Sequence, residues 1–367
     1  MPGTLRFDPD YQKAVAPFAT IAPPTAPDTH TLRNLTDAAI NAVMGVFPSY
    51  ESHVTETILS YPSTDGTQLA LHRFDPVAPP SPPLPANGNG HAALTSSNGS
   101  NNGRTAATTT TTPMTTTASS SATTRGARPA VLYLHGGGHI SGSPVLYRRD
   151  IVRYAHLTKQ VFFAPSYRLA PEHPFPTPFS DCYAALSYLH THAADLGIDP
   201  SRIAIMGLSA GGGLAVAVAL KARDEGKVGW VRKLVLVCPM LDDRTRLNEG
   251  AAEMRGFLTW TEGKNRIAWG AYLGGEEMVG KEEGVDEYAA PGRARYLGGM
   301  PRTYVDVGGL DLFRGESLEF AGRLAKAGGE VEVHVYPGVP HAWEWVAVAA
   351  PVTKRAVENR VSALKDL

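Results

Sequence analysis

The chain has few cysteines, almost no net charge and no long apolar run. Only Cys182 and Cys238 occur in its 367 residues, so a disulfide framework and a cysteine-rich metal site are both excluded. Cys182 falls on a predicted helix and Cys238 ends a predicted strand. We therefore expect two buried free thiols, in keeping with a reducing compartment.

Charge and hydropathy narrow the possible partners. The 34 basic and 35 acidic residues give a net charge of −1, so no excess charge attracts nucleic acid or an anionic membrane. No apolar run is long enough to span a bilayer. Residues 1–10 have neither the basic flank nor the apolar stretch of a signal peptide. We expect a cytoplasmic protein with no integral membrane segment and no nucleic-acid partner.

One segment, from about 79 to 128, has no aromatic residue and almost no large apolar residue. It passes from proline to asparagine and glycine, and then to threonine and serine. Such a chain buries too little apolar surface to offset the entropy of ordering it. We predict a disordered insert, for which a regulatory role and an inert expansion both remain open.

Strand and helix patterns alternate along the rest of the chain. This alternation predicts an α/β fold with a mostly parallel, twisted sheet and helices on both faces. Strands are predicted at 54–59, 67–74, 131–134, 161–164, 203–206, 234–237, 303–307 and 331–336, and helices at about 145–158, 179–193, 210–223, 315–327 and 351–365.

The most informative motif is Gly207-Leu208-Ser209-Ala210-Gly211. It joins the apolar strand at 203–206 to an Ala/Val/Leu-rich helix. A serine on such a sharp turn holds a strained backbone and presents its hydroxyl group, while glycines two residues away on either side allow close packing. The motif therefore predicts a nucleophilic serine at Ser209.

A second motif, His135-Gly136-Gly137-Gly138, directly follows the predicted strand at 131–134. A glycine-rich loop can turn its N–H groups toward a carbonyl oxygen that becomes an oxyanion during acyl transfer. A phosphate-binding loop would continue with Lys-Ser or Lys-Thr, whereas this loop continues with His139. We therefore favour an oxyanion loop.

The position of His341 makes it the candidate base. In parallel sheets the reacting groups lie in loops at the carboxyl ends of strands. His341 follows the strand at 331–336, whereas His334 lies inside that strand. We expect His334 to have a structural or surface role.

Asp311 is the candidate acid because it follows the strand at 303–307, within which Asp306 lies. Asp242 and Asp243 also follow a strand, at 234–237, and remain alternatives. The acid would accept the imidazole N–H, fix its tautomer and stabilise the imidazolium.

Together these stretches resemble the hormone-sensitive lipase-like family of α/β-hydrolase carboxylesterases. The resemblance covers about 130–345 and follows the family's order. The matching stretches are His135-Gly-Gly-Gly138, Tyr167-Arg-Leu-Ala-Pro-Glu-His-Pro-Phe-Pro176, Gly207-Leu-Ser-Ala-Gly-Gly212, Gly309-Leu-Asp-Leu-Phe313 and Gly338-Val-Pro-His341.

The resemblance implies the α/β-hydrolase fold and a catalytic triad of Ser209 as nucleophile, His341 as base and Asp311 as acid. It also implies an oxyanion hole formed by N–H groups, those of Gly137, Gly138 and Ala210.

A helical cap is implied as well. Residues 1–53 and 241–288 would form it, around a core made of 54–240, interrupted by the insert, and 289–367. One helical face near the N-terminus would pack over the active site, although a membrane-surface helix also fits. This face is marked by Leu32, Leu35, Ala39, Val43 and Val46.

Three positions depart from the family pattern. Leu208 replaces an aspartate before the nucleophile, His139 replaces an aromatic residue after the glycines, and Gly315 replaces a second aspartate. None is a member of the implied triad. The change at His139 bears on the shape of the pocket.

Several nearby residues are expected to support the site. We expect Arg168 and Glu172 to form a buried ion pair that braces the oxyanion loop, and His135 to fix that loop by hydrogen bonds. Trp343 and Trp345 flank His341 and either wall the pocket or fill the core.

The implied activity is hydrolysis of small-molecule carboxylic esters by two-step acyl transfer, with short to medium acyl chains and no cofactor or metal. An amide, including an acetyl amide, or a lactone could use the same machinery. A catalytically silent receptor is disfavoured because such receptors lack the catalytic histidine.

The rate of hydrolysis should rise between about pH 5.5 and 7.5 as His341 loses its proton. The oligomeric state stays open.

Overall fold

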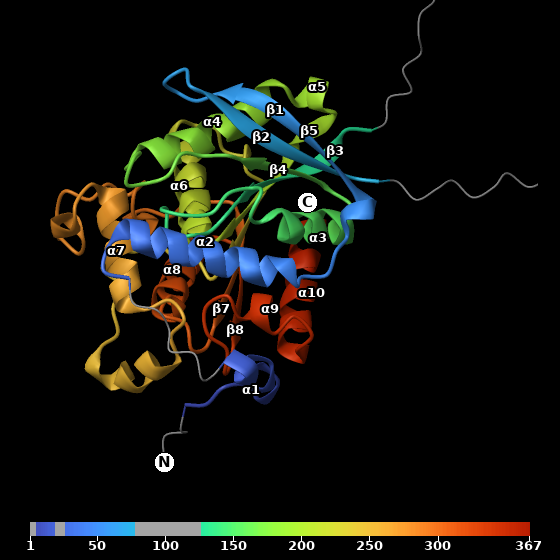
Figure 1. Cartoon of the computed structure of the whole chain (residues 1–367). Coiled ribbons are helices and arrows are strands. Elements are labelled where there is room, and N and C mark those ends of the chain that lie inside the picture. The colour runs from blue at the N-terminus through green and yellow to red at the C-terminus, as the bar shows by residue number, and fades with distance from the viewer. Residues whose placement is uncertain (1–4, 19–25, 78–125) are drawn as a thin grey trace, which may run out of the picture. The chain divides into compact units, whose positions relative to one another are not determined.

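The computed structural model describes residues 5–18, 26–77 and 126–367 (Figure 1). The predicted disordered insert at about 79–128 lies outside the described residues except for its last three positions.

Eight strands form one sheet in the order β1-β2-β4-β3-β5-β6-β7-β8. Pairing is antiparallel between β1 and β2 and between β2 and β4, and parallel in the rest of the sheet. All eight predicted strands are present, so the mostly parallel sheet is confirmed. The strands are β1 (Val54–Pro62), β2 (Gln68–Pro76), β3 (Arg128–Leu134), β4 (Val161–Pro165), β5 (Ile198–Leu208), β6 (Lys233–Val237), β7 (Arg302–Gly308) and β8 (Val331–Tyr336).

Helices cover both faces of this sheet (Figure 1). The five helices predicted from the sequence correspond to α3, α4, α6, α8 and α10, with ends that differ by at most three residues. The α-helices of the described residues are α1 (Pro9–Val15), α2 (Thr29–Gly45), α3 (Arg148–Thr158), α4 (Thr177–Thr191), α5 (Ala193–Leu196), α6 (Ala210–Asp224), α7 (Glu262–Leu273), α8 (Arg314–Lys326), α9 (Trp343–Val346) and α10 (Pro351–Lys365).

The period-two alternation of the strands divides the core into two layers. In β5, Ile203 and Ile205 belong to the layer that contains α4, α6 and α8. Ala204 and Met206 belong to the opposite layer, which contains α3 and α10. Because both faces are covered, β5 reads as a continuous apolar run.

The N-terminal helix α2 contacts α7 and α9 (Figure 1). Its buried side chains are Leu32, Ile40 and Met44. The predicted apolar face is wrong at Val46, which is 78% exposed, because the helix ends at Gly45 and its buried row runs through Ile40 and Met44.

Between β6 and β7 the chain leaves the sheet. The predicted cap insertion at 241–288 contains the 3-10 turns Glu249–Phe257 and Glu276–Met278 on either side of α7. The assignment of this segment and α2 to a cap stays a prediction. At the other end of the chain, α1 contacts α9, and the Asp8 N–H donates to the Gly338 carbonyl at 2.7 Å.

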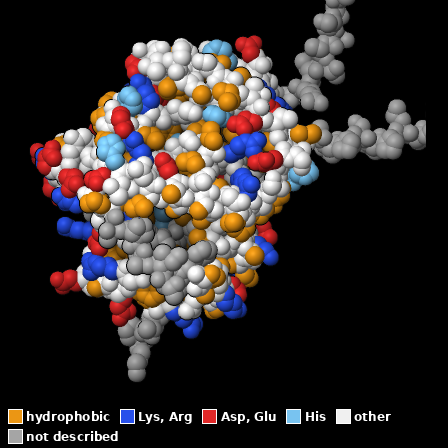
Figure 2. Space-filling view, in the orientation of Figure 1, with side chains coloured by type: hydrophobic (Ala, Val, Ile, Leu, Met, Phe, Trp, Pro, Cys, Tyr) orange, Lys and Arg blue, Asp and Glu red, His pale blue; other side chains and the backbone are white. Residues whose placement is uncertain are grey.

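Among the described residues, no helix is both long and apolar enough to cross a membrane. The face seen in Figure 2 carries acidic and basic side chains intermingled rather than gathered by sign.

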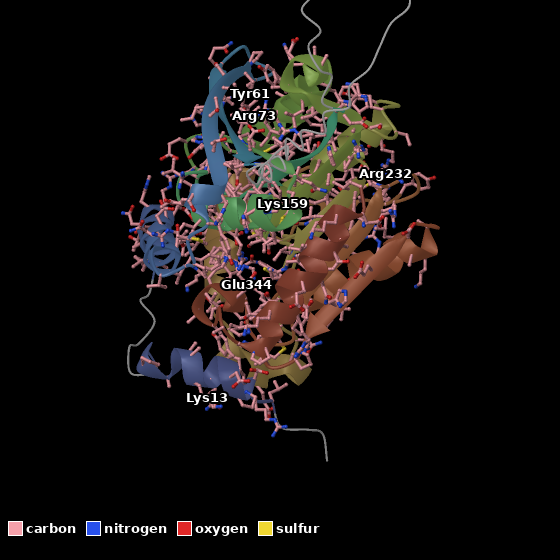
Figure 3. All side chains as sticks on the ribbon, turned by 90° about the vertical axis from the view of Figure 1, so that its right-hand side faces the viewer. Lys13, Tyr61, Arg73, Lys159, Arg232 and Glu344 are labelled. Carbon is pink, nitrogen blue, oxygen red and sulfur yellow. The ribbon has the colours of Figure 1, made fainter. Side chains whose placement is uncertain are left out.

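A buried ionic cluster supports the layer of α3 and α10. Arg360 donates to Asp306 at 2.6 Å and to Glu344 at 2.7 Å, and all three side chains are at most 1% exposed. Tyr304 adds a hydroxyl donor to Asp306 at 2.8 Å. Glu344, labelled in Figure 3, lies three residues after His341, so this cluster anchors the segment that carries the candidate base.

We predict that Arg360→Leu lowers the free energy of unfolding by about 3–5 kcal/mol, because it leaves two buried carboxylates without their cation. Chemical denaturation measures this loss. The control is Arg266→Leu, which removes an ion pair whose two side chains are about 60% exposed and should leave the midpoint nearly unchanged. Equal midpoints for the two variants would contradict the prediction.

Candidate active site

Ser209 occupies the single residue between β5 and α6. Its backbone is left-handed, with φ +52°, which is a strained conformation for a residue with a side chain. The Ser209 N–H donates to the Val237 carbonyl of the neighbouring strand at 2.9 Å and so ties the turn to the sheet. This is the strand–turn–helix context that the sequence motif predicted.

The two glycines of the motif are required by close packing. A Cβ atom on Gly207 would overlap the carbonyl group of Gly211. A Cβ atom on Gly211 would overlap the carbonyl oxygens of Leu134 and His135, where β3 enters the glycine-rich loop. The turn at Ser209 is therefore pressed directly against the candidate oxyanion loop.

The structure brings Ser209, His341 and Asp311 together from loops that follow β5, β8 and β7. His341 Nε2 lies 3.1 Å from Ser209 Oγ, and His341 Nδ1 lies 2.8 Å from Asp311 Oδ2. The other Asp311 oxygen accepts the Phe313 N–H at 3.0 Å, which fixes the carboxylate plane. The geometry matches a nucleophile, a base and an orienting acid.

The alternative acids and base have other partners. Asp242 pairs with Arg244 and Asp243 pairs with Arg293, both at 2.6 Å. Asp306 belongs to the Arg360 cluster described above. His334 Nε2 lies 2.8 Å from Glu332 on the same strand.

The electrostatic surroundings of His341 favour its protonated form. Burial lowers the pKa of His341, but the charge of buried Asp311, the neighbouring Cys238 and the hydrogen bond to Asp311 together raise the pKa well above its usual value. The neighbouring Cys238 thiol is buried, which raises its pKa to about 11 and leaves it neutral near pH 7.

The glycine-rich loop carries two residues in left-handed backbone, Gly137 at φ +115° and Gly138 at φ +61°. The structure gives their N–H groups no hydrogen-bond acceptor among the described residues. Ala210 opens α6, so its N–H has no partner within the helix either. Gly137 and Gly138 line the same cavity as Ser209 and His341, which leaves donors free beside the serine.

Two residues that the sequence analysis did not single out hold this loop to α2. Arg33 donates to the carbonyls of Ile140 and Ala170, each at 2.5 Å. One helical turn later, Asp37 accepts the Gly142 N–H at 2.9 Å. The spacing of four residues, which places both polar groups on one side of an amphipathic helix, is the only sequence signal for them.

The predicted ion pair between Arg168 and Glu172 is wrong. Arg168 pairs with buried Asp181 at 2.7 Å, whereas Glu172 pairs with Arg33 at 2.5 Å. Residues 168–172 are not helical, so side chains four residues apart do not share a face. The segment 168–172 therefore forms two separate ion pairs, one with α4 and one with α2.

Both histidines of the loop pack against aromatic rings. The prediction that His135 also fixes the loop by a hydrogen bond is confirmed, because His135 Nδ1 lies 2.8 Å from the Gly136 carbonyl oxygen. His135 stacks on Tyr167 with ring centroids 4.2 Å apart, and the Tyr167 hydroxyl donates to the His135 carbonyl at 2.8 Å. His139 is 1% exposed and stacks on Tyr272 at 3.9 Å. Burial lowers the pKa of His135 to about 4 and that of His139 to about 3, so both rings are neutral near pH 7.

A cavity of about 300 Å³ opens above Ser209 and His341. Trp345 lines it, whereas Trp343 is fully buried in the core, which answers the question left open by the sequence. Most of the remaining wall comes from α1, α2 and the predicted cap insertion. These residues are Tyr11, Leu32, Leu35, Thr36, Ala39, Ile40, Val43, Thr259, Trp260 and Lys264.

Comparison with known proteins agrees with this fold. A family model of the alpha/beta hydrolase fold matches residues 131–344. The chain belongs to this family.

Two relatives from Mycobacterium tuberculosis are similar to this chain over 65% of its length. Esterase LipI is 31% identical with 72% of its length covered, and carboxylesterase NlhH is 32% identical with 73% covered. Among solved structures, a bacterial heroin esterase is 33% identical to this chain, with a TM-score of 0.76. The alignment covers 98% of this chain and 97% of the heroin esterase chain. The predicted resemblance to the hormone-sensitive lipase-like α/β-hydrolases is confirmed.

Two departures from the family pattern have simple structural accounts. Leu208 is 3% exposed and packs in the core layer of α3 and α10. His139 takes the place of an aromatic side chain and stacks as one. Nothing in the structure explains Gly315, which has open space around it.

One cluster of potential metal ligands occurs among residues 5–18, 26–77 and 126–367. It consists of Cys238, Asp311 and His341, whose ligand atoms lie within 4.8 Å of one another. Asp311 and His341 are hydrogen-bonded to each other, so a metal bound by this cluster would compete with that hydrogen bond.

We predict that Gly211→Ala abolishes activity and destabilises the fold, because the new methyl group overlaps two carbonyl groups of the β3 loop. The matched control is Gly322→Ala in α8, where nothing lies within 4 Å of the new atom. That change should raise stability by up to about 1 kcal/mol through helix propensity. Ester hydrolysis and thermal unfolding of both variants measure this, and an active Gly211→Ala enzyme would contradict the packing argument.

Proposed function

We propose that this ester hydrolase cleaves carboxylic esters of short to medium acyl chain through Ser209, His341 and Asp311. The observation that carries the proposal is the continuous hydrogen-bonded chain from Ser209 Oγ through both nitrogens of His341 to Asp311. It lies at a cavity with mostly apolar walls, which suits the hydrocarbon part of an ester.

In the first step His341 Nε2 takes the proton of Ser209 as Oγ bonds to the ester carbonyl carbon. The carbonyl oxygen becomes an oxyanion, for which the N–H groups of Gly137, Gly138 and Ala210 are the proposed donors. Asp311 keeps the Nδ1 proton in place and stabilises the imidazolium.

Collapse of this intermediate breaks the bond to the alcohol oxygen, which leaves with the proton from His341. Water then attacks the acyl-enzyme while His341 takes one of its protons, and the acid is released as Ser209 recovers its hydrogen. Every proton is carried by residues of this chain, so the proposed reaction needs no cofactor.

Amides and lactones could react by the same steps. The similarity to proteins named esterases and carboxylesterases favours an ester over either of them.

The acyl range is proposed from the size of the cavity. At about 300 Å³ it stands at the lower end of small-molecule sites, which favours short and medium acyl groups over the long chains of lipids.

We predict that p-nitrophenyl esters from acetate to decanoate are hydrolysed fastest at short to medium length. Steady-state kinetics of the series measures kcat/KM for each ester. Ser209→Ala should lose several orders of magnitude in kcat and serves as the background control. A maximum at the longest chains would contradict the acyl range, and substantial turnover by Ser209→Ala would contradict the nucleophile.

The pH dependence follows from His341. The neutral form of His341 is the base, and Asp311 raises the pKa of that histidine. We therefore expect kcat/KM to rise with pH, with the midpoint of the rise above about pH 6.5, the ordinary histidine pKa. The rise should therefore lie toward or above the upper part of the range from pH 5.5 to 7.5 expected from the sequence. A pH–rate profile for one ester measures the midpoint.

The control for the pH profile is Asp311→Asn. It removes the charge that stabilises the imidazolium, so the midpoint of its residual rate should move to lower pH, and kcat should fall by about 10⁴ because the tautomer is no longer held. A midpoint that stayed in place would show that Asp311 does not act on His341.

A further inference from the structure

Lys264 is a cation in the wall of the substrate cavity. It stands in the first turn of α7 and lines the cavity together with Ser209 and His341. Apart from His341, no other residue of the described wall can carry a charge near neutral pH, because the rest are apolar, hydroxyl-bearing or glycine.

The structure gives this ammonium group no counter-ion. No carboxylate of the described residues lies within 4.0 Å of Lys264 Nζ. Residues 1–4, 19–25 and 78–125 contain neither aspartate nor glutamate, so the remainder of the chain cannot supply one. Burial lowers the pKa of Lys264, and no acidic neighbour opposes that effect.

Three arginines of the predicted cap insertion at 241–288 are paired with carboxylates. Arg255 binds Glu262 at 2.8 Å, Arg266 binds Glu276 at 3.3 Å and Arg244 binds Asp242 at 2.6 Å. Lys264 Nζ instead donates one hydrogen bond, at 2.9 Å, to the Thr259 carbonyl. An ammonium group has three donors, so two remain for a ligand.

A cation that is partly withdrawn from water and unpaired is unfavourable until an anion joins it. The N-terminal turn of α7 adds its own partial positive charge at this position. We propose that Lys264 binds a carboxylate of the substrate, so that the preferred esters carry a second, free carboxylate on the acyl or the alcohol part. This inference rests on the proposed ester hydrolysis and specifies its substrate class.

A positioning role for Lys264 would also affect catalysis. The Thr259 hydroxyl donates to the His341 carbonyl at 2.8 Å, so the hydrogen bond from Lys264 to Thr259 connects it to the catalytic loop. Loss of that connection would slow neutral and anionic esters alike. Selective loss of the anionic ester therefore separates substrate recognition from positioning.

The test compares kcat/KM for matched neutral and anionic esters in the parent enzyme, Lys264→Met and Lys264→Arg. On the acyl side the pair is mono-p-nitrophenyl adipate and p-nitrophenyl hexanoate, which differ by a carboxylate in place of a methyl group. On the alcohol side it is 4-carboxyphenyl butyrate and 4-methylphenyl butyrate. Differences in intrinsic reactivity cancel because each ratio is compared between variants.

We expect Lys264→Met to lower the anionic-to-neutral ratio by about tenfold in one of the two pairs, the size of a charge-assisted contact. Lys264→Arg keeps the charge and should retain most of the ratio. A ratio that stays unchanged in both pairs, or rates that fall together, would overturn the inference.

A binding measurement separates this inference from the proposed function. In Ser209→Ala, calorimetry with the mono-p-nitrophenyl adipate ester should show affinity that falls about tenfold when Lys264→Met is added. If the parent hydrolyses no ester, the proposed function fails while this measurement still tests Lys264. If the parent is active and affinity is unchanged, only the recognition of a carboxylate fails.

Discussion

The turn at Ser209 packs against itself at Gly207 and against the loop after β3 at Gly211, and leaves no room for a side chain at either position. Much of the site depends on this constraint. The serine takes a left-handed backbone there and lines the same cavity as Gly137 and Gly138. Strain at the serine is balanced by the surrounding sheet, which fixes the turn through the hydrogen bond to Val237.

The same loop is held from its other side by α2. Arg33 and Asp37 bind its backbone, while Leu35, Ala39 and Val43 of that helix line the cavity. One element therefore both shapes the substrate space and fixes the loop that would stabilise the oxyanion. Lys264 of α7 lines the same cavity, so the predicted cap segments supply much of the wall around reacting groups that come from the strand ends.

The sequence was sufficient to predict the sheet and to place Ser209 and His341 in loops after strands, where strand ends meet at one edge. The same argument left Asp242 and Asp243 open beside Asp311, and the family resemblance favoured Asp311. Long-range pairing was not accessible in the same way. The partner of Glu172 is Arg33, which lies 139 residues away, and the sequence spacing wrongly suggested Arg168. Nor could composition reveal that Lys264 lacks a counter-ion or that Cys238 lies against His341, since both depend on how loops fold over the sheet.

Labelling with a fluorophosphonate probe, followed by mass spectrometry of the modified peptide, tests whether Ser209 is an activated nucleophile. Such a probe reacts with a serine whose hydroxyl is activated by a neighbouring base. We expect a label on Ser209 that disappears in His341→Ala. A folded protein that takes no label, or takes it on another serine, would contradict the assembled Ser209–His341–Asp311 site.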